Sequence, residues 1–154
     1  MNRTIKISFF VLALLALGFF RETLFVSINS ILYDKFYKEN HHHVVWFLFF
    51  VNALSYQTVY IAKWVITPLF VFFYWFIQRK FLLFIFNEKR IIQWLGVLYL
   101  SLFLLAGVFF VAGWAFGKIH DGYAFSRLFM GLLQSPVPCM ILIPAIYLYR
   151  QTAE

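Results

Sequence analysis

The chain has 154 residues, of which 64% are hydrophobic, 23% aromatic and only 12% charged, and its net charge is +7. One soluble core of this size cannot enclose so many apolar side chains, so a lipid bilayer must cover much of the surface. The thirteen Lys and Arg residues stand in short clusters between apolar runs, which argues against a nucleic-acid-binding face. The composition therefore indicates an integral membrane protein.

The first apolar run, residues 7–20, follows two basic residues, as in a signal peptide or a signal anchor, and we favour the anchor. Its fourteen residues rise about 21 Å, which is short of a hydrocarbon core of about 30 Å, so we expect the span to cover 5–26. Arg21 and Glu22 then lie near the far interface. Adjacent helical residues point about 100° apart, so each is expected to need its own partner, either a headgroup or a neighbouring helix.

Residues 27–39 mix apolar and charged positions in a pattern that predicts a short interfacial helix. The three histidines at 41–43 are interpreted as a solvated loop, not a metal site, because consecutive side chains point apart.

A long stretch almost without charge follows at 44–77. It predicts one span over 44–62, then an inner-leaflet or juxtamembrane helix over about 65–86 in which Pro68 permits a kink. Two shorter crossings in this stretch would give an alternative fold with five spans.

The second predicted span carries a polar stripe. Asn52, Tyr56 and Lys63 recur on one face of a helix, with Ser55 beside them. In lipid, such stripes usually face other helices, so we favour helix packing over a substrate path.

The third predicted span covers 91–116 and the last covers 125–149. The last span contains Gln134, Ser135, Pro136 and Pro138. Ser135 is suited to an N-cap and Pro136 to a first helical position, so the span is expected to be kinked or broken into two half-helices. The prolines would leave three carbonyl groups without amide donors, those of Leu132, Gln134 and Met140. Donors for these carbonyls must then come from elsewhere in the bundle.

Four spans place both termini on one side, and seven basic residues collect there: Arg3, Lys6, Arg79, Lys80, Lys89, Arg90 and Arg150. The positive-inside rule makes this side cytoplasmic. The predicted fold is therefore all-α, a single transmembrane domain of about four helices with a broken last helix, in a bacterial inner membrane.

The polar groups of three predicted helices lie at similar depths in the membrane, which suggests that they are close together. Counted at about 1.5 Å per residue, Arg21 lies about 6 Å, Asn52 about 12 Å and Pro136 about 13 Å from the outer interface. We expect these groups to converge, with Arg21, Asn52 or Arg127 donating to the carbonyls freed near Pro136. The candidate packing or partner residues are Arg21, Glu22, Asn52, Ser55, Tyr56, Arg127, Gln134, Ser135 and Pro136.

Several short motifs resemble those of small membrane proteins associated with exosortase systems in Bacteroidetes. They are Arg21-Glu22 with Leu24-Phe25, Leu32-Tyr33-Asp34, Asn52-x-x-Ser55, Gln134-x-Pro136 and Leu142-Ile143-Pro144-Ala145-x-Tyr147. The resemblance covers most of the chain. It implies an inner-membrane companion of a protein-sorting transpeptidase, without catalysis of its own.

The leading hypothesis is accordingly a non-catalytic accessory or scaffold subunit, with the lipid bilayer and an integral membrane protein, possibly an exosortase, as partners. A small structural subunit of a transporter or respiratory complex is the alternative. An intramembrane thiol transpeptidase using Cys139, with Arg127 and His120, is less favoured because apolar surroundings disfavour the thiolate. All four histidines fall in predicted loops, so we expect no haem, and we expect no other cofactor or metal.

Overall fold

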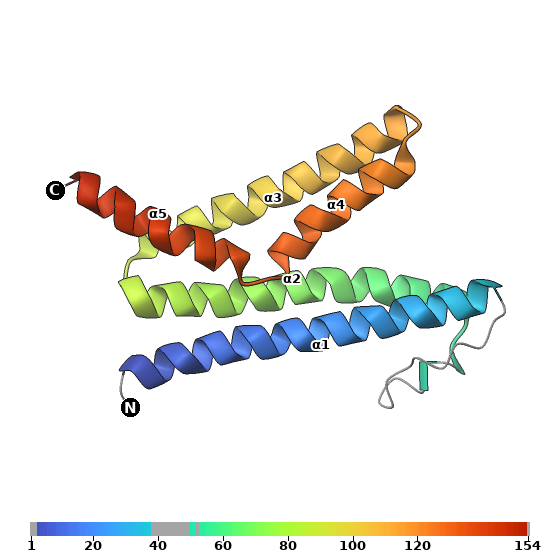
Figure 1. The fold of residues 1–154 in the computed structure, drawn as a ribbon, viewed down its shortest axis with the longest axis horizontal. Helices are drawn as coiled ribbons and strands as arrows, with labels where there is room; N and C mark the ends of the chain where they lie inside the picture. The colour runs from blue at the N-terminus through green and yellow to red at the C-terminus, as the bar shows by residue number, and fades with distance from the viewer. Residues whose placement is uncertain (1–2, 38–49, 52, 154) are drawn as a thin grey trace. The chain divides into compact units, whose positions relative to one another are not determined.

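A computed structural model describes residues 3–37, 50–51 and 53–153. This part of the chain is all-helical and without strands, as the sequence predicts, and its helices are α1 (Arg3–Tyr37), α2 (Tyr56–Phe86), α3 (Lys89–Ala115), α4 (Ile119–Leu133) and α5 (Val137–Ala153) (Figure 1). In length and composition α1, α2 and α3 can each cross a membrane, and the bent pair α4 and α5 can supply a fourth crossing. The helices are therefore compatible with a multi-pass membrane protein.

The chain divides into two compact units. The first unit comprises Met1–Leu14 and Phe73–Glu154, and the second comprises Leu15–Phe72. The second unit has a core of buried aliphatic side chains from α1, α2 and the turn before α2, formed by Ile28, Ile31, Val51 and Val59. Ring contacts of Phe36 with Tyr56 and of Phe20 with Phe70 show that its two helical segments run antiparallel.

Helix α1 runs without a break where the sequence predicted a span over 5–26 and a separate helix over 27–39. The predicted boundary marked a change from apolar to amphipathic residues. No proline stands anywhere in α1, and its one glycine, Gly18, comes well before the predicted boundary. No helix-breaking residue is therefore present that would end the helix there. A change of polarity alone therefore does not end a helix.

Helix α2 also differs from its prediction. It begins at Tyr56, and a single helix replaces the predicted span over 44–62 and the helix over 65–86. Residues 44–49 lie outside the described part of the chain. The helix continues through Pro68, and the hydroxyl of Thr67, the residue directly before it, donates to the Lys63 carbonyl at 2.8 Å, next to the Trp64 carbonyl whose amide donor Pro68 lacks. Proline is tolerated inside a membrane helix where nearby side chains and turns satisfy the freed backbone groups.

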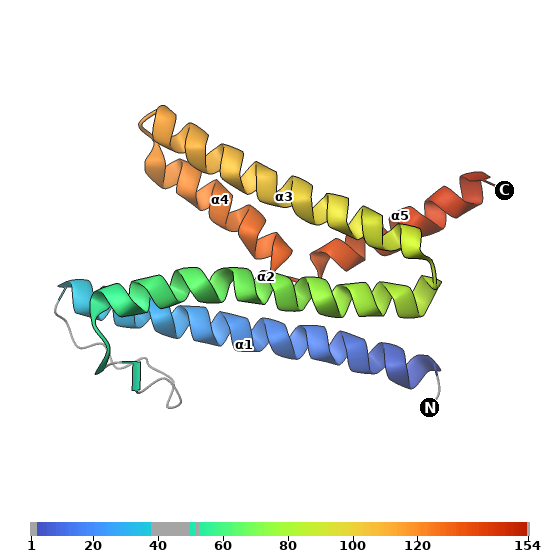
Figure 2. The same cartoon turned by 180° about the vertical axis from the view of Figure 1, so that it is seen from behind.

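Helices α3 and α4 form a tight antiparallel hairpin, which both views show (Figure 1 and Figure 2). The turn passes through Gly117, whose φ of 69° is one that glycine adopts without strain. Gly113 and Gly122 are buried where the helices meet, and a Cβ on Gly113 would lie 2.5 Å from the Gly122 Cα. Gly113 thus serves contact within the chain, and Gly117 serves the turn.

The pair α4 and α5 follows α3 along its length. Gly122 in α4 meets the end of α3, whereas Tyr149 in α5 packs against Trp94 in the second turn of α3, with ring centroids 5.2 Å apart. The two short helices therefore connect one end of α3 to the other. This arrangement is compatible with one broken span.

Candidate functional site

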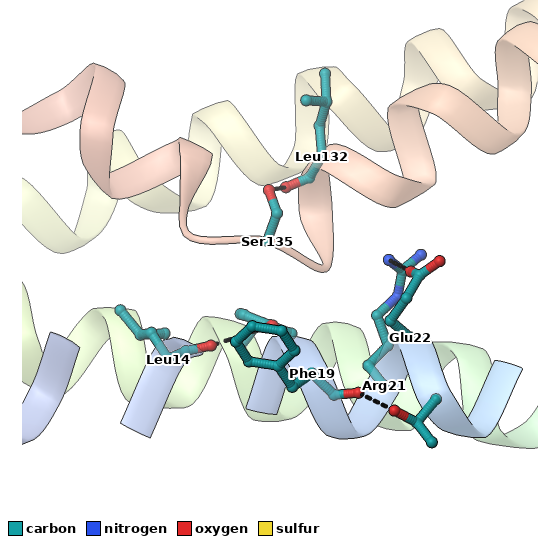
Figure 3. Close-up of polar contacts among 8 residues, drawn as sticks. Leu14, Phe19, Arg21, Glu22, Leu132 and Ser135 are labelled. Carbon is teal, nitrogen blue, oxygen red and sulfur yellow. Dashed lines mark hydrogen bonds and ion pairs between the residues drawn. The ribbon is translucent and has the colours of Figure 1, made fainter. Parts of the chain in front are cut away.

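The break between α4 and α5 is the main polar feature of the first unit. The two helices meet at 63°. The Ser135 hydroxyl donates to the Leu132 carbonyl at 2.7 Å (Figure 3). It also accepts a hydrogen bond from the Val137 amide at 3.3 Å. The first contact satisfies a carbonyl that Pro136 leaves without its amide, and the second caps the start of α5. Ser135 and Pro136 thus form the corner that the sequence predicted.

Two donors from other helices complete the corner. The Tyr99 hydroxyl in α3 donates to the Leu133 carbonyl at 3.1 Å, and the Gln78 amide in α2 donates to the Ser135 carbonyl at 2.7 Å. The sequence predicted outside donors for the Leu132, Gln134 and Met140 carbonyls, whereas the structure shows them at the Leu133 and Ser135 carbonyls, and Leu132 accepts from Ser135. The donors that the structure shows at the corner, Gln78 and Tyr99, are not among the residues that the sequence named, which were Arg21, Asn52 or Arg127.

These donors are deeply buried. Gln78 is 0% exposed, and its amide oxygen has no hydrogen-bond partner among the described residues. Tyr74, one turn earlier in α2, is also 0% exposed, and its hydroxyl lies 3.4 Å from the Leu14 carbonyl. Gln134 beside the corner is buried as well. The Gln78 amide nitrogen and the Tyr99 hydroxyl therefore join α2 and α3 to the corner.

Arg21 and Glu22 lie near the middle of α1 and not near its end, because α1 extends to Tyr37. Arg21 Nη1 lies 3.5 Å from Glu22 Oε2 (Figure 3), so the two charges form an ion pair with each other, although each was expected to need its own partner. Their Cβ atoms diverge, but the long, flexible side chains bring the charged groups together. The Arg21 guanidinium also lies 5.5 Å from the centre of the Phe25 ring.

The two charges of this pair differ in exposure. The Arg21 side chain is 23% exposed and the Glu22 side chain is 69% exposed. The Glu22 carboxylate is therefore the more exposed of the two charged groups on α1. Arg21 belongs to the second unit and the corner to the first, so their convergence stays a prediction.

Of the predicted polar stripe, the described part of the chain places Tyr56 and Lys63 on α2 but not Ser55. Asn52 lies outside the described residues, and Ser55 precedes α2. The Ser55 hydroxyl accepts the Thr58 amide at 3.3 Å and bonds the Thr58 hydroxyl at 2.8 Å, so Ser55 caps α2. Tyr56 is partly exposed and its ring contacts Phe36 and Tyr60. A serine that can accept first-turn amides favours a helix start over a position inside a helix.

The residues of the thiol hypothesis differ in burial. Cys139 is buried in the first turn of α5, at 3% exposure. Arg127 and His120 are exposed on α4. Within the described ranges no three His, Cys, Asp or Glu residues are grouped as a metal site, and the three histidines at 41–43 lie outside those ranges.

Gln78 and Tyr99 were missed because neither stands in a polar pattern. Gln78 directly precedes Arg79 and Lys80, and Tyr99 is an aromatic residue in the most apolar helix. The signal that could have found Gln78 is its four-residue spacing from Tyr74, which puts two hydrogen-bonding side chains on one helix face. Comparisons of the chain with models of protein families, with curated proteins and with solved structures find no match.

Proposed function

We propose that this chain is a non-catalytic accessory or scaffold subunit of a protein-sorting or secretion complex in the bacterial inner membrane, and that it works beside an exosortase. The motif resemblance supports this assignment, and it includes Arg21-Glu22 and Gln134-x-Pro136. Both termini are proposed to be cytoplasmic, because the basic residues concentrate with them.

The observation that carries the proposal is the exposed carboxylate of Glu22 on α1. A charged group on a membrane-crossing helix is costly in lipid, and such groups usually face another helix or an aqueous cavity. The polar groups at the α4–α5 corner are used within the chain, whereas Glu22 is 69% exposed. Its ion pair with Arg21 leaves the carboxylate largely exposed, and a partner helix with a hydrogen-bond donor would cover it, which is the behaviour of an accessory subunit.

Site-specific photo-cross-linking in a host that contains an exosortase system tests this proposal. Val26 lies one turn after Glu22 and is 55% exposed, so it is a suitable probe position. Val108 on α3 is 61% exposed and provides a matched control on another helix. We expect a cross-link from Val26, but not from Val108, to one integral membrane protein that also co-purifies in mild detergent.

The Glu22→Gln variant should lose this cross-link while the protein stays at its normal level in the membrane. Identification of the cross-linked protein then separates a sorting complex from a transporter or respiratory complex. Adducts with lipid alone at Val26, together with purification of the chain without any partner, would overturn the proposal.

A further inference from the structure

Basic side chains gather at one end of the first unit. The Lys6 ammonium lies 5.5 Å from the centre of the Phe84 ring, which brings the start of α1 beside the end of α2. Arg150 near the end of α5 forms an ion pair with Glu88 in the turn between α2 and α3. These contacts bring together the ends of helices that carry the residues we name the basic end: Lys6, Arg79, Lys80, Lys89, Arg90 and Arg150.

The basic end carries an excess of positive charge. Glu88 is its one carboxylate within the described part of the chain, and Arg150 already pairs with it. Lys89 and Arg90 are exposed, and neither has an ion-pair partner among the described residues. Both stand in the first turn of α3, which contains no acidic residue, so the helix dipole adds to the unfavourable potential. An external anion would relieve it.

Two other cations of the basic end lie against aromatic rings. Lys80 lies over the Phe76 ring at 5.5 Å and Arg79 over the Trp75 ring at 5.4 Å. Tyr149 and Trp94 pack together at the same end. Tryptophan and tyrosine concentrate where a membrane protein meets the headgroups, and long basic side chains extend there. The basic end therefore has the residue composition that is typical of protein surfaces in contact with lipid headgroups.

We propose that the basic end binds the headgroups of anionic phospholipids, with Lys89 and Arg90 as the main phosphate contacts. Clusters of Lys and Arg beside a transmembrane helix attract anionic lipids, and the attraction falls off within a Debye length. The bound lipid supplies the negative charge that the first turn of α3 lacks. The proposal does not depend on the protein partner of α1.

Native mass spectrometry of the full chain, released from bilayer discs of phosphatidylcholine with phosphatidylglycerol, tests this proposal. The ratio of the two retained lipids is the measured quantity. Lys89→Gln is compared with Lys118→Gln, since both lysines are exposed and flank α3 at opposite ends. Far-UV circular dichroism checks that each variant keeps its helices.

We expect the wild type to retain phosphatidylglycerol in preference to phosphatidylcholine. Lys89→Gln should lower this preference about fivefold, since one basic residue at an anionic surface contributes roughly that factor. Lys89→Gln/Arg90→Gln should lower it further, Lys118→Gln should leave it nearly unchanged, and Glu88→Gln should raise it.

Equal lipid ratios for the wild type and the double variant would overturn the proposal. An equal loss in Lys118→Gln would show that total charge, and not the basic end, attracts the lipid. Displacement of phosphatidylglycerol by millimolar inorganic phosphate would indicate a site for a free anion, which also contradicts a lipid site.

Discussion

Gly113 and Gly122 pack backbone to backbone, so that a Cβ added to either would lie 2.5 Å from the Cα of the other. A Cβ on Gly122 would also lie 2.7 Å from the Phe109 carbonyl oxygen. Because the obstructing atoms belong to helix backbones, no side-chain rotation can make room. The hairpin of α3 and α4 depends on the absence of both side chains.

Alanine at either glycine should therefore separate the two helices and destabilise the protein. We expect Gly113→Ala or Gly122→Ala to lower the free energy of unfolding by about 1 to 3 kcal/mol, the usual cost of overpacking. Thermal unfolding in detergent measures this change. Gly107→Ala is the control, because nothing lies within 4 Å of a Cβ at that position. Equal stability of the three variants would contradict the close packing.

The donors at the α4–α5 corner should differ in their contribution. Tyr99→Phe leaves the Leu133 carbonyl without its donor and should cost about 1 to 3 kcal/mol of unfolding free energy. Gln78→Leu removes the donor to the Ser135 carbonyl, but it also removes the unpartnered amide oxygen, so its cost should be smaller.

Ser101→Ala is the matched control for these two variants, because the Ser101 hydroxyl is exposed and bonds only carbonyls of its own helix. Chemical unfolding in mixed micelles ranks the variants. If Gln78→Leu destabilised the protein more than Tyr99→Phe, the contact at Ser135 would be the stronger one and this ordering would be wrong.

Glu88 and Arg150 should couple weakly. Their side chains are 53% and 42% exposed, so solvent screens the ion pair, and a double-mutant cycle should give a coupling energy of at most about 1 kcal/mol. The exchange Glu88→Arg/Arg150→Glu should recover part of the loss caused by either single reversal. Repeating the cycle at high salt should reduce the coupling, and a coupling that salt leaves unchanged would show a desolvated pair instead.

The rate at which the Cys139 thiol is labelled should indicate how tightly the α4–α5 corner is packed. Its thiol is buried at 3% exposure in the first turn of α5, so a maleimide reagent should react slowly in the folded protein and quickly after unfolding. Tyr99→Phe should increase the reaction rate of the folded protein, because it loosens the attachment of α4 to α3. Fast labelling of the folded wild type would show that the thiol is accessible, as a catalytic cysteine would need to be.

The local features of this fold could be read from the sequence, and the long-range contacts could not. Ser135 followed by Pro136 specified the helix break, because a hydroxyl cap and a missing amide act within one turn. The choice of Tyr99 and Gln78 as donors depends on how α2 and α3 pack, which no local pattern records. Ser55 shows an intermediate case, since its capping chemistry was visible but its spacing also suited a helical stripe.

The position of the donors in the chain has a consequence for membrane insertion. Gln78 and Tyr99 precede Leu133 and Ser135 in the chain, so the donors are synthesised before the carbonyls that they serve. Helices α4 and α5 can then pack against a surface that already carries donors for their carbonyls. The order of synthesis thus matches the order in which the polar groups need partners. A chain with the same helices in a different order would have to hold bare carbonyls in lipid until their donors arrived.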